Sequence, residues 1–414
     1  MAGEWPEIPL GEVVTLQRGF DLPRQDRKPG KVPIVSSSGV SDFHSEVGVK
    51  GPGVVTGRYG TIGQVFLIAE DFWPLNTTLW VKDFHGNDQR FASYLLRTVD
   101  FLSCSDKSSV PGVNRNDLHR IPVLLPPLTE QKAIASVLGA LDDKIELNRR
   151  MNATLETMAR ALFQSWFVDF DPVRVKLDGR QLPGLDEATA ELFPANFRDS
   201  AAGHIPNAWT VEPIGVVVDC VGGGTPSTAE PKYWEGGTHH WTTPKDLSSL
   251  QAPVLLDTDR KLTDAGIAKI SSGLLPTGTL LLSSRAPVGY LAIAAMPVAI
   301  NQGFIALKCN ERASNYFMLN WCQTNMAEIE SRATGTTFAE ISKRNFRPIS
   351  MVLPSIELMA AFTEWVAPLY TQIINNLHQS RTLATLRDTL LPKLLSGDLS
   401  VRNLENVAEA EAAA

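Results

Sequence analysis

The sequence has few cysteines, no long apolar run and no surplus of basic residues, and each absence excludes a class of protein. The four cysteines, at positions 104, 220, 309 and 322, have no Cys-x-x-Cys spacing, so neither a disulfide framework nor a zinc site is indicated. No stretch reaches the roughly 18 apolar residues of a membrane span, and residues 1–10 lack the features of a signal peptide. We therefore expect a cytoplasmic protein that does not contact a membrane.

Catalytic motifs are also absent. The sequence contains no G-x-x-x-x-G-K-[ST] phosphate loop, no G-x-S-x-G nucleophile turn and no H-E-x-x-H zinc motif. The adjacent His239 and His240 would point apart on a strand, so they do not form a metal site by themselves. We expect no catalytic residue, no metal and no cofactor in this chain.

The net charge of −7 argues against nucleic-acid binding, because phosphate contacts require Lys and Arg. The distribution of charge weakens that objection. Residues 1–128 carry 13 basic and 14 acidic side chains, and residues 205–355 carry 12 of each. The excess acidity lies elsewhere, so both segments remain candidates for binding nucleic acid.

The chain repeats once along its length. The run Trp5-x-x-x-Pro9-Leu10-Gly11 returns as Trp209-x-x-x-Pro213-Ile214-Gly215, shifted by 204 residues. Further matches pair GRYGTIG at 57–63 with SRAPVG at 284–289, Asn76 with Asn301, Gly112-Val113-Asn114 with Gly335-Thr336-Thr337, and IPVLLPP at 121–127 with PISMVLP at 348–354. The shift grows along the chain, which predicts about 20 extra residues in the second copy, around positions 236–264.

A long helix is expected after each copy. Over 134–162, the residues expected on one face of a helix follow one another at alternating steps of four and three, as in the contact seam of a coiled coil, and we call them seam residues. The same steps recur 228 residues later. The seam residues include Leu138, Leu141, Ile145, Asn148, Leu155, Val366, Leu369, Ile373, Asn376 and Leu383. Asn148 and Asn376 occupy the same place in the two seams, where they either fix the register from a buried position or face solvent. Pro368 is expected to start the second helix or to kink it.

These patterns predict an α+β protein with a pseudo-twofold internal repeat. Each of two similar domains is expected to combine mixed or antiparallel strands with short helices, and two long helices between the domains form an antiparallel coiled coil. The predicted segments are a first domain over 1–128, a first spacer helix over 129–168, a connector over 169–208, a second domain over 209–355, a second spacer helix over 356–396 and a tail over 397–414.

Several runs resemble the specificity subunit of type I restriction-modification enzymes, in order along nearly the whole chain. The runs GGTPS at 223–227, YW at 233–234 and WTTPKDL at 241–247 resemble the opening of that family's target-recognition domains, and TGTTF at 334–338 resembles their close. The runs LLPPLTEQ at 124–131 and ALFQSWFVDFDP at 161–172 resemble the two ends of its spacer helix. The first domain lacks the GGTPS run, and PSIEL at 354–358 lacks the glutamine found at the family's helix start.

The resemblance implies that the two domains are target-recognition domains, each reading one half of a bipartite double-stranded DNA target while the helices set the spacer. A helix of about 30 residues spans roughly 45 Å, or about 13 base pairs. The resemblance also implies a non-catalytic subunit that assembles with two modification (methyltransferase) subunits and with restriction (translocase and nuclease) subunits. S-adenosylmethionine, ATP and Mg would belong to those partners.

A different interpretation is a non-catalytic assembly scaffold that acts through the coiled coil and never contacts DNA. The near-neutral domains favour it, whereas the unequal loops of the two copies suit a reader of two different half-sites.

Base reading is expected from polar side chains on loops, with Arg favoured for guanine and Asn or Gln for adenine. In the first domain the candidates are Arg24, Arg27, Lys28, Ser36, Ser37, Ser38, Arg58, Tyr59, Lys107 and Arg115. In the second they are Thr225, Ser227, Lys245, Arg285, Gln302, Thr336, Thr337, Lys343 and Arg344.

Overall fold

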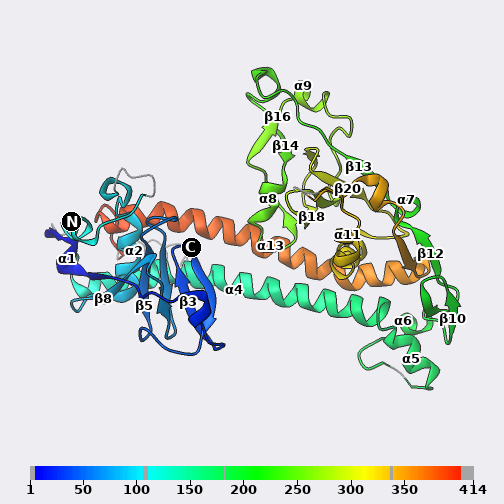
Figure 1. The fold of residues 1–414 in the computed structure, drawn as a ribbon, viewed down its shortest axis with the longest axis horizontal. Helices are drawn as coiled ribbons and strands as arrows, with labels where there is room; N and C mark the ends of the chain where they lie inside the picture. Colours follow the sequence, from blue (N-terminus) through cyan, green and yellow to red (C-terminus); the bar gives the residue numbers. More distant parts are fainter. Residues whose placement is uncertain (1–4, 106–110, 181, 336–338, 402–414) are drawn as a thin grey trace, which may run out of the picture. The chain divides into compact units, whose positions relative to one another are not determined.

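The computed structural model describes residues 5–105, 111–180, 182–335 and 339–401, and the chain divides into two compact units (Figure 1). Unit 1 comprises Met1–Glu146 and Ser380–Ala414, and unit 2 comprises Leu147–Gln379. Each unit therefore contains one copy of the sequence repeat and part of both long helices. Within the described ranges, no helix has the length and apolar character needed to cross a membrane.

Unit 1 has two main sheets, besides the pair formed by β1 and β9. Its strands are β1 (Glu7–Pro9), β2 (Thr15–Arg18), β3 (Val32–Ser36), β4 (Gly39–His44), β5 (Gly53–Gly57), β6 (Val65–Ile68), β7 (Trp73–Pro74), β8 (Thr78–Asp83) and β9 (Pro122–Leu124), and its helices before the long one are α1 (Leu10–Val13), η1 (Arg24–Asp26), α2 (Gln89–Thr98), η2 (Leu102–Cys104) and α3 (Arg115–Leu118). An antiparallel sheet has the order β2-β8-β5-β6, and a mixed sheet has the order β4-β3-β7. Helix α2 contributes Phe91 and Leu95 to a core shared with Leu16 and Val54 of the first sheet.

Unit 2 has the same plan with more elements. The connector forms α5 (Asp171–Leu177), α6 (Glu187–Glu191), β10 (Phe197–Ser200) and β11 (Gly203–Pro206). The second copy forms β12 (Thr210–Pro213), α7 (Ile214–Val217), β13 (Asp219–Gly222), η3 (Pro231–Tyr233), β14 (His239–Thr242), α8 (Pro244–Ser248), β15 (Val254–Leu255), β16 (Arg260–Leu262), α9 (Asp264–Ile267), β17 (Leu280–Ser284), β18 (Val288–Ala294), β19 (Val298–Ile300), β20 (Phe304–Lys308), α10 (Asn315–Thr324), α11 (Met326–Ser331), α12 (Lys343–Phe346) and β21 (Ser350–Leu353). Its two main sheets have the orders β13-β20-β17-β18-β15 and β16-β14-β19.

The two units share a backbone framework, which confirms that the domains are similar. Strand β1 pairs with β9 as β12 pairs with β21, and a four-residue helix follows β1 and β12. The amides of Leu10 and Ile214 donate to the carbonyls of Ile121 and Ile349, at 2.8 and 2.9 Å. Most of the extra residues of the second copy form α8 and β15, between β14 and β16, where unit 1 has a short turn. That insertion lies in the predicted region, and a further part follows it, between α9 and β17.

Strand pairing corrects the alignment of the two copies. Tyr59 bridges Gly112, and Arg285 bridges Glu340 in the same antiparallel manner. Gly112 therefore corresponds to Glu340, and its match with Gly335 is wrong by five residues. Tyr59 corresponds to Arg285, so the match of residues 57–63 with residues 284–289 is wrong by one. Loops of different length carry no periodic signal, and only the ladder of backbone hydrogen bonds fixes their correspondence.

The long helices α4 (Leu128–Phe167) and α13 (Ile356–Leu395) pack against each other in antiparallel directions, as predicted. In unit 2, the Asn148 amide lies 2.9 Å from Gln379, and the ring centroid of Phe163 lies 6.3 Å from that of Phe362. Residue numbers therefore increase along α4 in the direction in which they decrease along α13, so the two helices are antiparallel. The structure buries Leu138, Asn148, Val366, Ile373 and Asn376, and it half-buries Leu141, Ile145, Leu155, Leu369 and Leu383.

The polar seam positions lie inside the helix pair. Asn148 is 0% exposed and Asn376 is 4% exposed, so neither faces solvent. The Asn376 Nδ2 donates to Oδ1 of Asn152 across the pair at 2.9 Å, as expected of an asparagine that fixes register. The expected helix start at Pro368 is wrong: α13 begins at Ile356 and continues through the proline, which removes one backbone donor without ending the helix.

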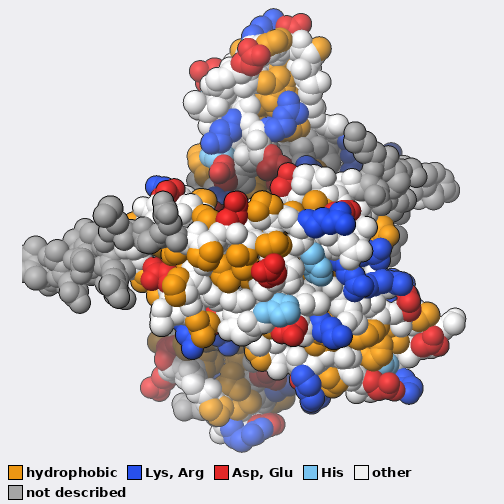
Figure 2. Space-filling view, turned by 90° about the vertical axis from the view of Figure 1, so that its left-hand side faces the viewer, with side chains coloured by type: hydrophobic (Ala, Val, Ile, Leu, Met, Phe, Trp, Pro, Cys, Tyr) orange, Lys and Arg blue, Asp and Glu red, His pale blue; other side chains and the backbone are white. Residues whose placement is uncertain are grey.

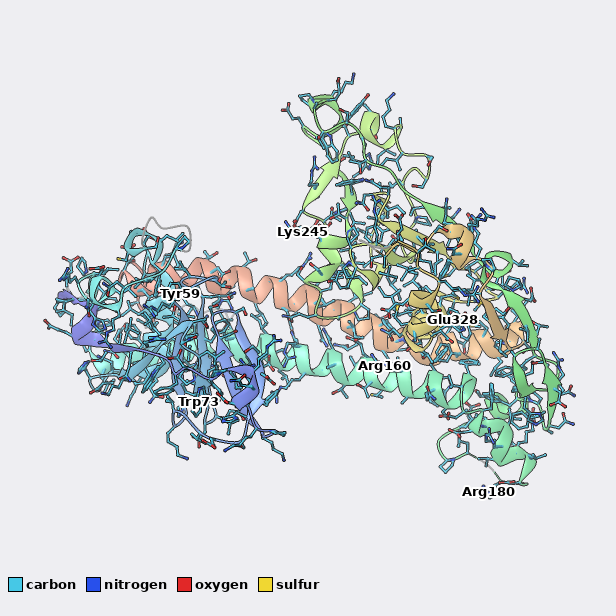
Figure 3. The ribbon with its side chains drawn as sticks, viewed as in Figure 1. Tyr59, Trp73, Arg160, Arg180, Lys245 and Glu328 are labelled. Carbon is cyan, nitrogen blue, oxygen red and sulfur yellow. The ribbon has the colours of Figure 1, made fainter. Side chains whose placement is uncertain are left out.

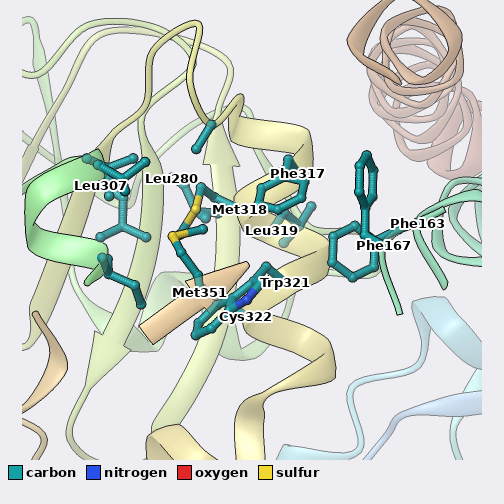
Figure 4. Packing of buried hydrophobic residues seen from close by; sticks show 14 of the residues in the cluster. Phe163, Phe167, Leu280, Leu307, Phe317, Met318, Leu319, Trp321, Cys322 and Met351 are labelled. Carbon is teal, nitrogen blue, oxygen red and sulfur yellow. The ribbon is translucent and has the colours of Figure 1, made fainter. Parts of the chain in front are cut away.

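Aromatic side chains anchor the end of α4 in the core of unit 2. The rings of Phe163 and Phe167 face Phe317 of α10, with centroid distances of 5.3 and 5.1 Å (Figure 4). Trp166 is 1% exposed and packs edge-on against Phe193, at 5.1 Å. Because large aromatics dominate the energetics of a core, this cluster ties the helix to the unit that carries the second copy.

Candidate nucleic-acid interface

A cleft of about 410 Å³ in unit 1 collects three arginines. Arg18 ends β2, Arg58 follows β5, and Arg115 opens α3. Tyr59 and Asn114 complete the polar lining, and we call these five residues the arginine cleft. Three of them, Arg58, Tyr59 and Arg115, were predicted from the sequence, and the fold brings them together although 57 positions separate the outer two.

Local contacts hold the cleft in shape. The Arg58 Nε donates to the carbonyl of Val113 at 3.3 Å, and its guanidinium lies 4.6 Å from the ring centroid of Tyr59. Figure 3 labels Tyr59. Arg18 donates to both carboxylate oxygens of Asp21, at 3.1 and 3.2 Å. A Cβ atom at Gly112 would lie 2.2 Å from Cε1 of Tyr59, so a side chain there would displace the tyrosine ring.

The predicted serine turn lies beside the same loop. The Ser36 hydroxyl donates to the carbonyl of Gly39 at 3.0 Å and lies 3.1 Å from the Ser38 hydroxyl. The Ser37 Oγ lies 3.4 Å from the place where a Cβ on Gly60 would stand. The turn thus adds small hydroxyl groups next to the loop that carries Tyr59.

The other basic candidates of unit 1 do not line the arginine cleft. Arg27 Nη1 lies 2.8 Å from Asp42, and Lys28 Nζ lies 2.8 Å from Glu46. The hydrogen bond from Arg27 holds the pKa of Asp42 below its usual value, and the one from Lys28 lowers the pKa of Glu46. Both acids are therefore ionised at neutral pH and offset those two positive charges. Arg24 is exposed on η1, and Lys107 lies outside the described residues.

In unit 2, Thr225 and Gln302 form one polar pair, in which the Thr225 hydroxyl donates to Oε1 of Gln302 at 2.6 Å. The corresponding pair in unit 1 is Asp21 and Asn76, whose Nδ2 donates to Asp21. Strand pairing places Gln302 at the position of Asn76, so the sequence match of Asn76 with Asn301 is wrong by one residue. Asn76 is a candidate reading residue that the predicted set omitted.

The remaining loop candidates of unit 2 lie outside its strands, Ser227 between β13 and η3 and Lys245 in α8. The Ser227 carbonyl accepts a hydrogen bond from Trp234 Nε1 at 2.9 Å. Lys245 is exposed in the first turn of α8 (Figure 3). Arg260, which was not predicted, stacks on the Trp234 ring with 3.5 Å between the guanidinium carbon and the ring centroid. No sequence pattern links these two residues, because long-range contacts bring their segments together. The Thr263 amide donates to the Tyr233 carbonyl, and the Trp234 ring packs on Trp241, which pairs with Arg260.

Unit 2 has its own cationic group at the place that corresponds to the arginine cleft. Arg285 lies at the position of Tyr59, and its Nη1 is 3.7 Å from Oε2 of Glu340. Lys343 and Arg344 are exposed on α12. Gly222 corresponds to Arg18 of unit 1, and a Cβ atom built on Gly222 would lie 3.3 Å from Nζ of Lys343. Thr336 and Thr337 lie outside the described residues.

The thiols and histidines of unit 2 do not form a reactive group. Burial raises the pKa of Cys220 to about 11 and that of Cys309 to about 12, so both thiols stay protonated at neutral pH. His239 and His240 contact different carboxylates, those of Asp264 and Asp257, at 2.7 and 3.2 Å. In the part of the chain that the structure describes, no group of three or more His, Cys, Asp or Glu residues could hold a metal ion.

Basic and acidic side chains are interspersed over the face that Figure 2 shows. This surface agrees with the near-equal numbers of the two signs in residues 1–128 and 205–355. The face that Figure 2 shows therefore offers DNA local cationic groups rather than a broad basic field.

Comparison with known proteins identifies the family. The family model of the type I restriction modification DNA specificity domain matches residues 2–157 and 206–365, once in each copy of the repeat. The chain belongs to this family. The chain is 25% identical over 336 residues to the type I restriction enzyme HindI specificity subunit of Haemophilus influenzae. The match covers 71% of this chain and 72% of that subunit. It is 34% identical over 167 residues to the MjaIX specificity subunit of Methanocaldococcus jannaschii, which covers 40% of this chain and 38% of the relative.

The fold of the specificity-domain chain also has a solved counterpart. The crystal structure of a type I restriction-modification system S subunit from M. genitalium superposes with a TM-score of 0.58 and 16% sequence identity. The match covers 94% of this chain and 96% of that chain. The likeness extends over both copies and both long helices.

Proposed function

We propose that this chain is the DNA-specificity subunit of a type I restriction-modification complex, that it is not itself catalytic, and that each unit reads one half of a bipartite DNA target. The observation that carries the proposal is a repeated framework with different side chains at equivalent positions. Tyr59 corresponds to Arg285, and Asn76 corresponds to Gln302. A repeated framework presents its loops in a similar way, whereas different side chains on those loops read different bases. The names of the two relatives, both specificity subunits, support this assignment.

Other subunits are needed to supply the chemistry. In unit 2, α4 exposes Leu147, Met151 and Met158 by 41%, 36% and 51%. Their spacing of four and seven residues places them in one stripe on the helix, and a stripe of this kind favours packing against another protein. We assign it to a modification subunit that carries S-adenosylmethionine and methylates adenine, with restriction subunits supplying ATP-driven translocation and Mg-dependent cleavage.

The proposal predicts a bipartite methylation motif whose halves can be exchanged separately. The full chain is co-expressed with its modification subunit, and methylated adenines on a plasmid are mapped by single-molecule sequencing. Replacing residues 205–355 by the same segment of another family member should change one half of the motif and leave the gap and the other half unchanged. Absence of methylation, or an unchanged motif after the exchange, would favour an assembly scaffold that does not contact DNA.

The helices should set the gap between the two half-sites. Inserting seven residues after Glu146 and seven after Gln379 keeps the heptad register in both helices and adds about 10.5 Å, or about three base pairs. We therefore expect the mapped gap to lengthen by about three base pairs while both halves stay the same. The control is a seven-residue insertion at 201–202, in the exposed turn between β10 and β11, which should leave the gap unchanged. An unaltered gap in the helix variant would show that the helices do not measure the spacer.

A further inference from the structure

The two units differ in charge at the same place in their frameworks. Unit 1 has Arg18 and Arg58 where unit 2 has Gly222 and Ser284, and Arg115 corresponds to Lys343. Unit 1 has Gly112 where unit 2 has Glu340. Among the described residues, the arginine cleft therefore contains three guanidinium groups and the carboxylate of Asp21, which pairs with Arg18. The corresponding positions of unit 2 carry Arg285 and Lys343, with the carboxylate of Glu340 beside Arg285.

We propose that the arginine cleft binds a phosphodiester of the DNA backbone, so that unit 1 supplies the larger share of the electrostatic affinity and unit 2 depends more on base contacts. This inference rests on the proposed function. It goes beyond it because it assigns unequal roles to two units that share one framework.

The geometry of the cleft fits an anion. Its arginines repel one another, and a negatively charged group between them removes that cost. Among the described residues, the Nη groups of Arg58 have no carboxylate partner, while its Nε and ring contacts fix the direction of the guanidinium. A guanidinium matches the paired oxygens of a phosphate, and the cost of ordering Arg58 is already met before the ligand binds.

A guanine base is a weaker match than a phosphate. The O6 and N7 atoms of guanine satisfy one guanidinium. Arg18 already pairs with Asp21, so if a guanine took Arg58, Arg115 would have no anionic partner among the described residues. A phosphate oxygen pair can accept from Arg58 and Arg115 together. Glu340 would repel a phosphate at the corresponding place in unit 2, which is the reason for the expected difference between the units.

The test measures how DNA affinity depends on salt. The assembled complex is titrated with a labelled duplex that contains the mapped motif and with a duplex that lacks it, between 50 and 200 mM salt. Arg58→Gln and Arg115→Gln should each weaken binding to both duplexes by about tenfold at low salt and reduce the slope of log affinity against log salt by about 0.9. Arg180→Gln, a surface arginine paired with Asp178 in the connector, is the matched loss of one charge and should leave both values unchanged.

A second variant tests the asymmetry by a gain of affinity. Glu340→Gln removes the carboxylate beside Arg285 and should raise the affinity for both duplexes, whereas the same change at the exposed Glu328 of α11 (Figure 3) should not. Each variant complex is compared with the wild type by thermal midpoint, so that lost folding is not taken for lost binding.

The outcomes separate this inference from the proposed function. A loss confined to the motif duplex, with an unchanged salt slope, would assign the arginines to a base and overturn the phosphate site. Unchanged binding in the arginine variants would show that the cleft does not contact DNA, and unchanged binding in Glu340→Gln would remove the asymmetry. If the wild-type complex shows no preference for any motif, the proposed function itself fails.

Discussion

Replacing Trp166 with alanine is expected to lower the free energy of unfolding of unit 2 by about 3–5 kcal/mol. The indole is 1% exposed and packs against Phe167, Phe193 and Phe362, with centroid distances of 6.1, 5.1 and 6.0 Å. Its removal leaves a cavity between α4, the connector and α13, which the rigid aromatic neighbours cannot fill. Far-UV circular dichroism of the full chain during heating should show an earlier transition.

The matched control for this variant is Met158→Ala on the same helix. Met158 is 51% exposed, so its truncation should change the stability by no more than about 0.5 kcal/mol. Equal thermal midpoints for Trp166→Ala and the wild type would mean that the aromatic cluster does not hold α4 in unit 2.

Replacing Asp142 with asparagine is expected to destabilise unit 1 by about 2 kcal/mol at neutral pH. Asp142 accepts hydrogen bonds from Arg387 Nη1 at 2.6 Å, from the Tyr94 hydroxyl at 2.7 Å and from Arg97 Nη1 at 3.2 Å. These bonds join α2 and both long helices, and the carboxylate side chain is 22% exposed. An asparagine keeps the shape but leaves the two arginines without their shared negative charge.

The effect of Asp142→Asn should depend on pH in a defined direction. Burial raises the pKa of Asp142, but hydrogen bonds from Arg387 and Tyr94 outweigh burial and hold the pKa below the usual 3.8. A carboxyl group with a lowered pKa adds stability above its unfolded pKa, and this contribution is lost as the pH falls through the folded pKa. The difference between wild type and variant should therefore be constant from pH 7 to about pH 4 and shrink below it.

Thermal midpoints measured across this pH range test the prediction. The control is Asp143→Asn, because Asp143 is 66% exposed and its ion pair is with Arg90, a more exposed arginine than either partner of Asp142. Its effect should be smaller at every pH. A difference for Asp142→Asn that persists unchanged at pH 3 would show that the ionised carboxylate is not the source of the stability.

The helices and the polar seam were predictable because their signal is local. The steps of four and three over 134–162 report one face of a helix, and the residues on that face, Asn148 among them, are buried or half-buried. The proline rule allowed Pro368 to start or to kink the second helix, and a start there is wrong because the helix is packed on both sides of the proline. Phe362 and Val366 are buried before Pro368, and Tyr370 and Ile373 are buried after it.

The reading surface was predictable only in part. Arg58, Tyr59 and Arg115 were predicted from their side-chain chemistry, and the fold places the first two after β5 and Arg115 at the start of α3. Arg18 was missed because it ends a strand, and its place in the cleft depends on the pairing of β2 with β8. Asn76 was missed for a similar reason, since its contact with Asp21 joins residues that are 55 positions apart.

The sequence by itself therefore determined that the chain is duplicated, that long paired helices follow each copy, and which residue types could contact DNA. These properties depend on composition and on the spacing of neighbouring residues, and a linear pattern contains that spacing. Only the tertiary structure decided which positions of the two copies correspond. It also decided that three arginines of unit 1 share one cleft, and that Glu340 lies beside Arg285 at the corresponding place in unit 2. Those relations depend on the register of strands that are distant in sequence, which long-range backbone pairing sets and local patterns do not contain.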